Sequence, residues 1–177
     1  ARIGMQHTGL PLGIASEGAF VADPLGGFMP WNVEVLLWID DENHIEVVGL
    51  AQGPTRSLHR AVRCWPELES FAIEAGFPEH HLMLRPQSES DLRVRKGLND
   101  WATLRRVFTD CQRESGNSQV YAENDHRAFC HPTRQSMIQR AAADLLKKLQ
   151  SACPACSLPG FSIVGHQAGL PCLPAPA

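Results

Sequence analysis

The polar residues that could do chemistry are concentrated behind one short β-type segment. Residues 118–122 are predicted to form a strand, and residues 135–149 an amphipathic helix. The segment between them combines carboxylate, imidazole, guanidinium and hydroxyl groups: Glu123, Asn124, Asp125, His126, Arg127, His131, Thr133 and Arg134. α/β proteins usually bind ligands between the carboxyl end of a strand and the amino end of a helix. Imidazoles suit proton transfer and guanidinium groups suit phosphate, so this segment is the candidate site.

Charged groups elsewhere could join this site. Glu17 follows an apolar run, residues 10–15, and Lys96 ends a local basic cluster. Each candidate also has a structural interpretation. Glu17 could cap a turn at the end of its strand, Asp125 and Arg127 could form an internal salt bridge, and the two histidines could lie on the surface or be satisfied by the protein.

The C-terminal region contains a possible metal site. Cys153 and Cys156 have the C-x2-C spacing with which two thiolates grip one tetrahedral Zn²⁺. The pair follows a helix and enters Pro/Gly-rich sequence, which favours a metal over a redox motif. Further ligands are expected ~10–20 residues later, where His166 and Cys172 occur, although Ala175 occupies the position of a second C-x2-C. We expect a closed, structural zinc site, with a metal-free tail as the alternative.

The remaining segments predict an α/β fold with a mixed sheet. A hairpin is expected from residues 33–39 and 45–50, joined by an Asp-rich turn. Helices are expected at residues 1–8, 55–63, 66–75 and 98–113, and further strands at 10–15 and 80–84. Strands and helices alternate after the hairpin, which is typical of α/β proteins. We expect residues 1–150 to form this domain and residues 151–177 a zinc-ribbon-like tail.

Composition excludes several classes of function. The 177 residues carry a net charge of −3, which argues against nucleic acid as a partner. No apolar run approaches the ~18 residues of a membrane span, and no signal peptide is recognisable. Six cysteines are spread too unevenly for a disulfide framework, so we expect reduced thiols and a cytoplasmic location. Composition does not predict the oligomeric state.

Several motifs resemble a bacterial domain-of-unknown-function family. They are Gly-Leu-Pro-x-Gly-x-Ala-Ser-Glu-Gly-x-Phe at 9–20, Glu-x-Asp-x-Arg-Ala at 123–128, Pro-Thr-Arg at 132–134 and Cys-Pro-x-Cys at 153–156. Gly-Phe-Pro-Glu-His at 76–80 and Lys-Gly at 96–97 also fit. The chain departs from that pattern at Ala175, at His131 where Asn is common, and by an expected N-terminal segment that this chain lacks.

The chain is more distantly similar to the house-cleaning pyrophosphatases that remove inosine and xanthosine triphosphates. This resemblance implies a nucleotide phosphohydrolase in which Glu17 and Asp125 hold Mg²⁺ together with triphosphate oxygens. His126 would transfer a proton. The small-molecule phosphate ligand would be bound by the remaining polar groups: Lys96, Arg127, His131, Thr133 and Arg134.

Two hypotheses from different classes therefore stand. A metal-dependent phosphohydrolase predicts that Glu17 and Asp125 converge within reach of one Mg²⁺. A non-catalytic interaction module, docked through its zinc tail, predicts that they do not.

Overall fold

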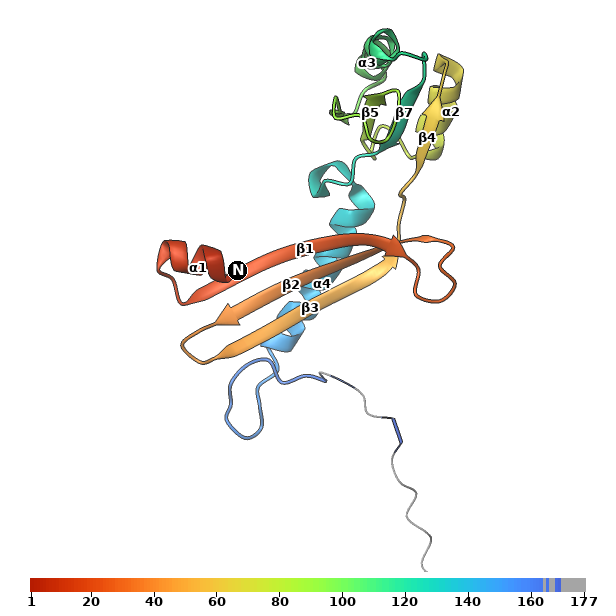
Figure 1. Cartoon of the computed structure of the whole chain (residues 1–177). Coiled ribbons are helices and arrows are strands. Elements are labelled where there is room, and N and C mark those ends of the chain that lie inside the picture. The colour runs from red at the N-terminus through yellow and green to blue at the C-terminus, as the bar shows by residue number, and fades with distance from the viewer. Residues whose placement is uncertain (164, 166–167, 170–177) are drawn as a thin grey trace, which may run out of the picture.

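A long three-stranded antiparallel sheet forms one half of the molecule. The computed structural model describes residues 1–163, 165 and 168–169. The strands are β1 (Leu12–Ala22), β2 (Pro30–Asp40) and β3 (Ile45–Pro54), in the order β1-β2-β3. The short helix α1 (Arg2–Thr8) precedes β1 and ends at Gly9, which adopts the left-handed conformation that favours glycine. Figure 1 shows the sheet face-on, with β1 and β3 as its two edges.

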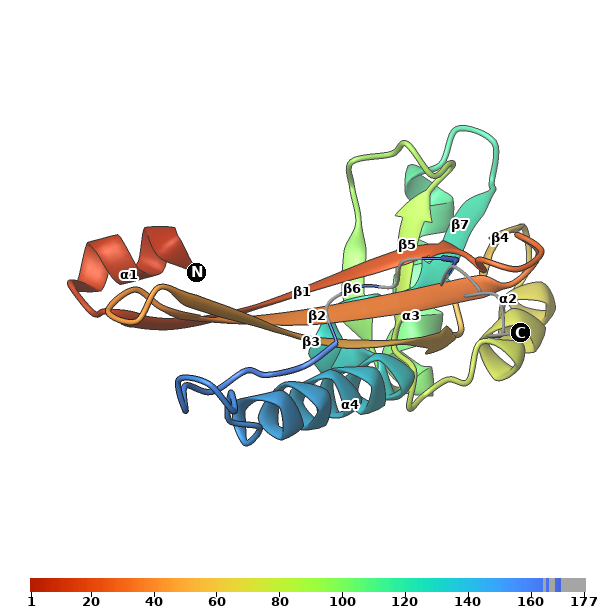
Figure 2. The same cartoon turned by 90° about the horizontal axis from the view of Figure 1, so that it is seen from below.

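Helix α4 (Pro132–Leu149) covers one face of this sheet. Met137, Ala141 and Leu145 from the helix pack against Leu36 and Val47 of the sheet. Strand β3 presents small residues at 49, 51 and 53 toward the helix, so the helix backbone can approach it closely. Figure 2 shows α4 lying along the underside of the three long strands.

A second, four-stranded antiparallel sheet forms the other half. Its order is β4-β7-β5-β6, built from β4 (His59–Val62), β7 (Val120–Asn124), β5 (Leu82–Pro86) and β6 (Arg95–Leu98). Helices α2 (Trp65–Glu74) and α3 (Trp101–Glu114) close its core around Phe71, Leu84 and Leu104. This core and the core under α4 have no buried residue in common.

Two chain crossings join the halves. One is the link from β3 to β4, residues 55–58, and the other runs from β7 through the 3-10 turn η1 (Ala128–Cys130) into α4. In Figure 1 the first crossing starts at the C-terminal end of β3, beside the turn that joins β1 to β2, and the second crossing enters α4. The polar segment singled out in the sequence is therefore part of the junction between the two sheets.

The structure confirms the α/β class, the hairpin and three of the expected later helices. The strands divide between two sheets, and every described strand pair is antiparallel, whereas a single mixed sheet was expected. The prediction of a helix at 55–63 is wrong: residues 59–62 are β4, because their backbone pairs with β7. Tertiary pairing here overrides local sequence preference.

Helix α4 begins at Pro132, three residues before its expected start. His131 is the N-cap, and its Nδ1 accepts a hydrogen bond from the backbone N–H of Arg134 at 3.2 Å. The hydroxyl of Thr133 in the first turn lies 2.9 Å from Nε2 of His80. Among the described residues, no helix is both long and apolar enough to cross a membrane.

Candidate functional site

Asp125 and Arg127 form a tightly bonded pair at the end of β7. The Asp125 carboxylate is completely buried. It accepts hydrogen bonds from the Gly97 N–H at 2.9 Å and from Arg127 Nη2 at 2.5 Å. Burial alone would raise the pKa of Asp125, but the hydrogen bonds from Arg127 and Gly97 hold that pKa below its ordinary value. The carboxylate is therefore ionised and its oxygens are already engaged by protein donors.

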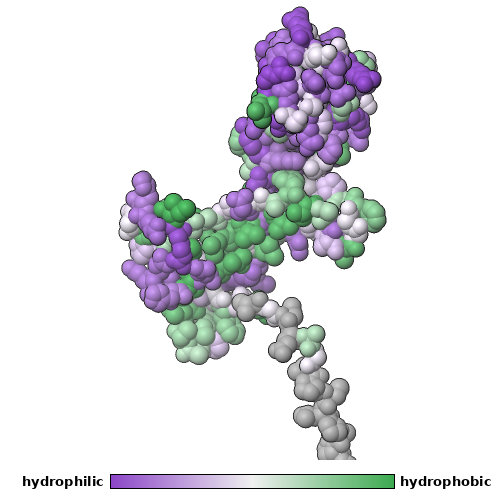
Figure 3. Space-filling model, in the orientation of Figure 1, coloured by the Kyte–Doolittle hydropathy of each residue, from purple (hydrophilic) through white to green (hydrophobic). Residues whose placement is uncertain are grey.

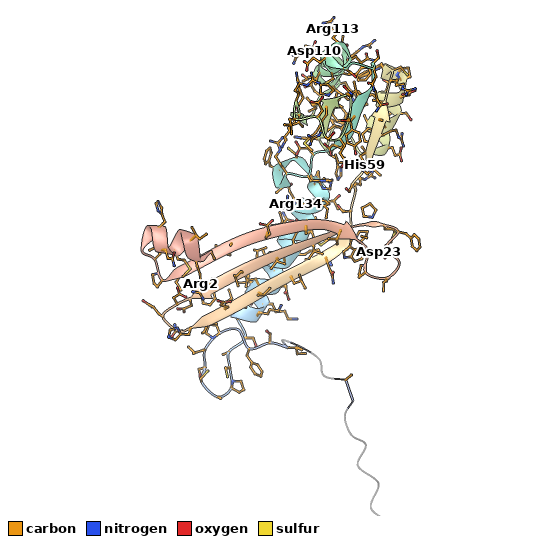
Figure 4. All side chains as sticks on the ribbon, in the orientation of Figure 1. Arg2, Asp23, His59, Asp110, Arg113 and Arg134 are labelled. Carbon is orange, nitrogen blue, oxygen red and sulfur yellow. The ribbon has the colours of Figure 1, made fainter. Side chains whose placement is uncertain are left out.

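A second buried ion pair links the long sheet to α4. Arg134 donates from Nε to Glu34 Oε1 at 2.6 Å, and from Nη1 to the carbonyl oxygen of His126 at 2.7 Å. Glu34 is fully buried on β2. Its partner in register on β1 is Gly18, where a Cβ would collide with the carboxylate of Glu34 and with Arg134. Figure 4 shows Arg134 between the two sheets.

Two buried acceptor oxygens beside this pair lack donors within the described residues. They are Glu34 Oε2 and Asn32 Oδ1. The amide orientation of Asn32 is fixed, because its Nδ2 donates to Glu34 Oε1 at 3.0 Å and to the Ala19 carbonyl at 3.2 Å. Sequence reasoning missed Asn32 and Glu34. The available signal was their position two residues apart on one face of an otherwise apolar strand.

Three histidines and one phenylalanine pack in the junction. The ring of His126 stacks on Phe20 with centroids 4.0 Å apart, and His80 meets His131 edge-on at 4.7 Å. His131 Nε2 lies 2.8 Å from the Arg56 carbonyl and so ties one crossing to the other. Burial lowers the pKa of His126 to about 4 and also lowers those of His80 and His131. All three are neutral bases near neutral pH.

These groups surround an open cleft of about 290 Å³. Lys96 lies at its rim, is exposed, and makes no salt bridge to a described residue. The cleft is lined by Met83, Lys96, Asp125, His126, Arg127 and Arg134. Five of the eight residues assigned catalytic or substrate-binding roles line the cleft. A sixth, His131, lies beside His126 with ring centroids 5.8 Å apart. Thr133 lies nearby, bonded to His80.

Glu17 does not belong to this group. Side chains alternate between the faces of a strand, so Gly18 and Phe20 point toward the junction and Glu17 points to the opposite face. Glu17 is exposed, and its carboxylate accepts the Gly18 N–H at 3.1 Å. Together with the engaged oxygens of Asp125, this placement does not fit a Mg²⁺ ion shared by Glu17 and Asp125. Within the described part of the chain, no group of three His, Cys, Asp or Glu side chains could hold a metal.

The cysteine pair of the tail lies in a tight turn after α4. The Cys153 N–H donates to the Leu158 carbonyl at 2.8 Å, and the Ser157 N–H donates to the Cys153 carbonyl at 2.8 Å. Hydrogen bonds from the Ala155 and Cys156 backbone lower the pKa of the Cys153 thiol. The other two expected ligands, His166 and Cys172, lie outside the described residues.

Comparison with protein families places the chain. The family model described as a domain of unknown function (DUF6671) matches residues 1–176. The chain belongs to this family. Neither the curated proteins nor the solved structures gave a match. Membership of DUF6671 agrees with the resemblance to a domain-of-unknown-function family, and it assigns no reaction.

Proposed function

We propose that this DUF6671 protein binds the phosphate groups of a nucleotide in the junction cleft. The observation that carries the proposal is the charge of the cleft, which is lined by Lys96, Arg127 and Arg134 against the single carboxylate of Asp125. Arg127 neutralises Asp125 and Arg134 neutralises Glu34, so Lys96 leaves the cleft positively charged. The Arg127 side chain is 41% exposed, so it can also contact a ligand. Lysine and arginine at one opening suit a phosphate chain.

The proposal includes hydrolysis of a phosphoanhydride bond. His126 lines the cleft as a neutral imidazole, and its buried Nε2 has no hydrogen-bond partner among the described residues. In this proposal the bound ligand brings a water to that nitrogen, and the neutral imidazole accepts the proton of the water as it attacks the phosphorus and displaces the leaving phosphate. Since Glu17 and Asp125 do not converge, no step is assigned to a metal held by them.

The test is equilibrium binding of tripolyphosphate and of a panel of nucleoside triphosphates, combined with an assay for released phosphate. Lys96→Gln should weaken binding about tenfold, the effect of losing one charge-assisted contact. Lys147→Gln is the matched control, since Lys147 is an exposed lysine on α4 that does not line the cleft. Equal affinities of the two variants for the ligand would contradict the proposed site. Binding of nucleotide without release of phosphate would contradict the hydrolysis step and support nucleotide binding alone.

A second proposal is that the tail docks the protein to a partner through a structural zinc. It is supported by the turn at Cys153 and Cys156, whose backbone N–H groups favour the thiolate that binds metal. Elemental analysis for zinc tests this proposal independently of the junction cleft.

A further inference from the structure

The two edges of the long sheet differ in how their outward backbone groups are bonded by the rest of the chain. On β3 two of the outward-pointing backbone groups are bonded by α4: the Leu50 N–H donates to Asp144 Oδ2 at 2.9 Å, and Lys148 Nζ donates to the Val48 carbonyl at 2.8 Å. Asp144 and Lys148 also pair with each other at 2.7 Å. A sheet edge covered in this way cannot accept another strand.

On the β1 edge no side chain of a described helix bonds the outward backbone groups, although Met5 of α1 packs over Gly13 near the start of the strand. The backbone N–H of Asp41 donates to the Pro11 carbonyl and the backbone N–H of Asp23 to the Met29 carbonyl, so the odd-numbered residues of β1 direct their backbone groups toward β2. The even-numbered residues 12–22 therefore direct their N–H and C=O groups outward. Among the described residues only one of these outward groups, the Gly18 N–H, has a partner, the carboxylate of its neighbour Glu17. Leu12 and Ile14 on this edge are 50% and 61% exposed.

The sequence of this edge lacks the features that prevent pairing. Leu12–Ala22 is an 11-residue strand with neither proline nor lysine, and Glu17 is its one charged residue. Long, flat edge strands without lysine or proline readily pair with another strand. In Figure 1 the edge runs along the upper side of the sheet, and Figure 3 shows hydrophobic residues over the adjoining sheet face.

We propose that β1 pairs antiparallel with β1 of a second copy of this chain, with the two-fold axis at Ala15. In this register even-numbered residues face even-numbered residues, so their outward N–H and C=O groups bond reciprocally. Leu12 faces Gly18 of the second copy and Ile14 faces Ser16, so each large side chain meets a small one. The pairing spans residues 12–18 and leaves Phe20 on His126.

Charge selects this register over a neighbouring one. With the axis at Glu17, the two Glu17 carboxylates would lie directly opposite each other and repel. With the axis at Ala15, Glu17 faces Gly13, which is covered by the uncharged side chain of Met5 and places no carboxylate opposite Glu17. The proposed pairing is independent of any ligand at the junction, and it would join two long sheets into one six-stranded sheet.

The test is sedimentation of the full chain over a concentration series that extends into the micromolar range. The wild-type protein should form a dimer, and Ile14→Lys should shift it to monomer because a lysine enters the paired edge. Val48→Lys, an exposed β-position on the covered edge, should leave the dimer intact. A wild-type monomer at every concentration, or a dimer that survives Ile14→Lys, would overturn the proposal.

The register has its own readout, which does not depend on the stability of a charged variant. Ala15→Cys should form an intermolecular disulfide under mild oxidation, because non-hydrogen-bonded partners approach to about 4.5 Å between Cα atoms. Ala19→Cys, on the same strand and face, should not, since its partner in this register is residue 11. The wild-type chain measures the background from its own thiols. Crosslinking of both variants, or of neither, would contradict the Ala15 axis.

Discussion

Glu34 and Arg134 are the pair of residues on which the geometry of the junction most depends. Their ion pair joins β2 to the start of α4, and Arg134 also bonds the carbonyl oxygen of His126 in the crossing. Arg134→Met should lower the free energy of unfolding by about 3–5 kcal/mol, because Glu34 would remain buried without its counter-charge. Chemical denaturation measures the change. Arg140→Met, an exposed arginine on the same helix, should change stability by less than about 0.5 kcal/mol. Similar effects of the two substitutions would show that the pair does not hold the junction.

The lowered pKa of His126 should make the free energy of unfolding depend on pH. Its pKa falls from 6.5 in the unfolded chain to about 4 in the folded protein, chiefly because it is buried. Between these pH values the unfolded chain binds a proton that the folded chain does not, so stability falls as the pH falls through this window. His126→Asn should therefore show a shallower loss than the wild type in denaturation midpoints measured from pH 6.5 to pH 4. Comparing the two proteins cancels the contributions of His80 and His131, and parallel pH profiles would exclude a depressed pKa at His126.

The site residues that lie in one short segment could be predicted from the sequence, whereas the site residues contributed by the distant strand β2 could not. Asp125, His126, Arg127 and Arg134 are close in the sequence and line one cleft. The contribution of Glu34 depends on register, which places it opposite Gly18 and beneath Arg134. Glu17 was assigned to the site by its motif, but strand alternation places its side chain on the other face.

At the scale of elements, the close approach of α4 to β3 depends on the glycines of that strand. A Cβ on Gly49 would meet the Leu145 Cβ at 2.5 Å and the Leu145 backbone nitrogen at 2.8 Å. Gly49→Ala should lower the free energy of unfolding by about 1–3 kcal/mol, the usual cost of overpacking. In Gly4→Ala the new methyl group meets nothing within 4 Å, and that substitution in α1 should stabilise slightly by its helix propensity. An unchanged denaturation midpoint in Gly49→Ala would contradict the packing.

The proposed zinc site at Cys153 and Cys156 leads to a prediction of metal content. The purified chain should contain about one zinc, bound by thiolates of the Cys153 turn, and Cys153→Ala should remove it. Cys64→Ala, an exposed cysteine in the other half of the molecule, should leave zinc unchanged. Elemental analysis decides this: zinc retained in Cys153→Ala, or absent from the wild type, would refute the tail site.

Elements with strong local signals could be predicted, and those set by distant pairing could not. The hairpin, α2 and α3 follow from periodicity and proline position, whereas the start of α3, three residues after the expected position 98, is set by the Asp100 side chain, which accepts the Thr103 N–H. Strand β4 has no comparable signal. His59, Arg60 and Ala61 are exposed and only Val62 is buried, so its extended backbone follows from pairing with β7.

At the scale of the whole molecule, two sheets with separate cores meet at two crossings. A single sheet was expected within residues 1–150, because alternation of strands and helices does not reveal which strands pair. The division matters for function, since the candidate cleft lies where the second sheet meets the crossing into α4. A larger hollow of about 590 Å³ lies along Arg60, Arg63 and Pro66 on the second half, away from the crossings. Arg60 is already paired with Glu74 at 2.8 Å.

The most direct test of the central claim is a crystal structure of the protein with tripolyphosphate bound. We predict phosphate oxygens within hydrogen-bond distance of Lys96 and Arg127, with the Asp125–Arg127 and Glu34–Arg134 pairs intact. Phosphate bound along Arg60 and Arg63, with the junction cleft unoccupied, would contradict the assignment of the junction as the functional site.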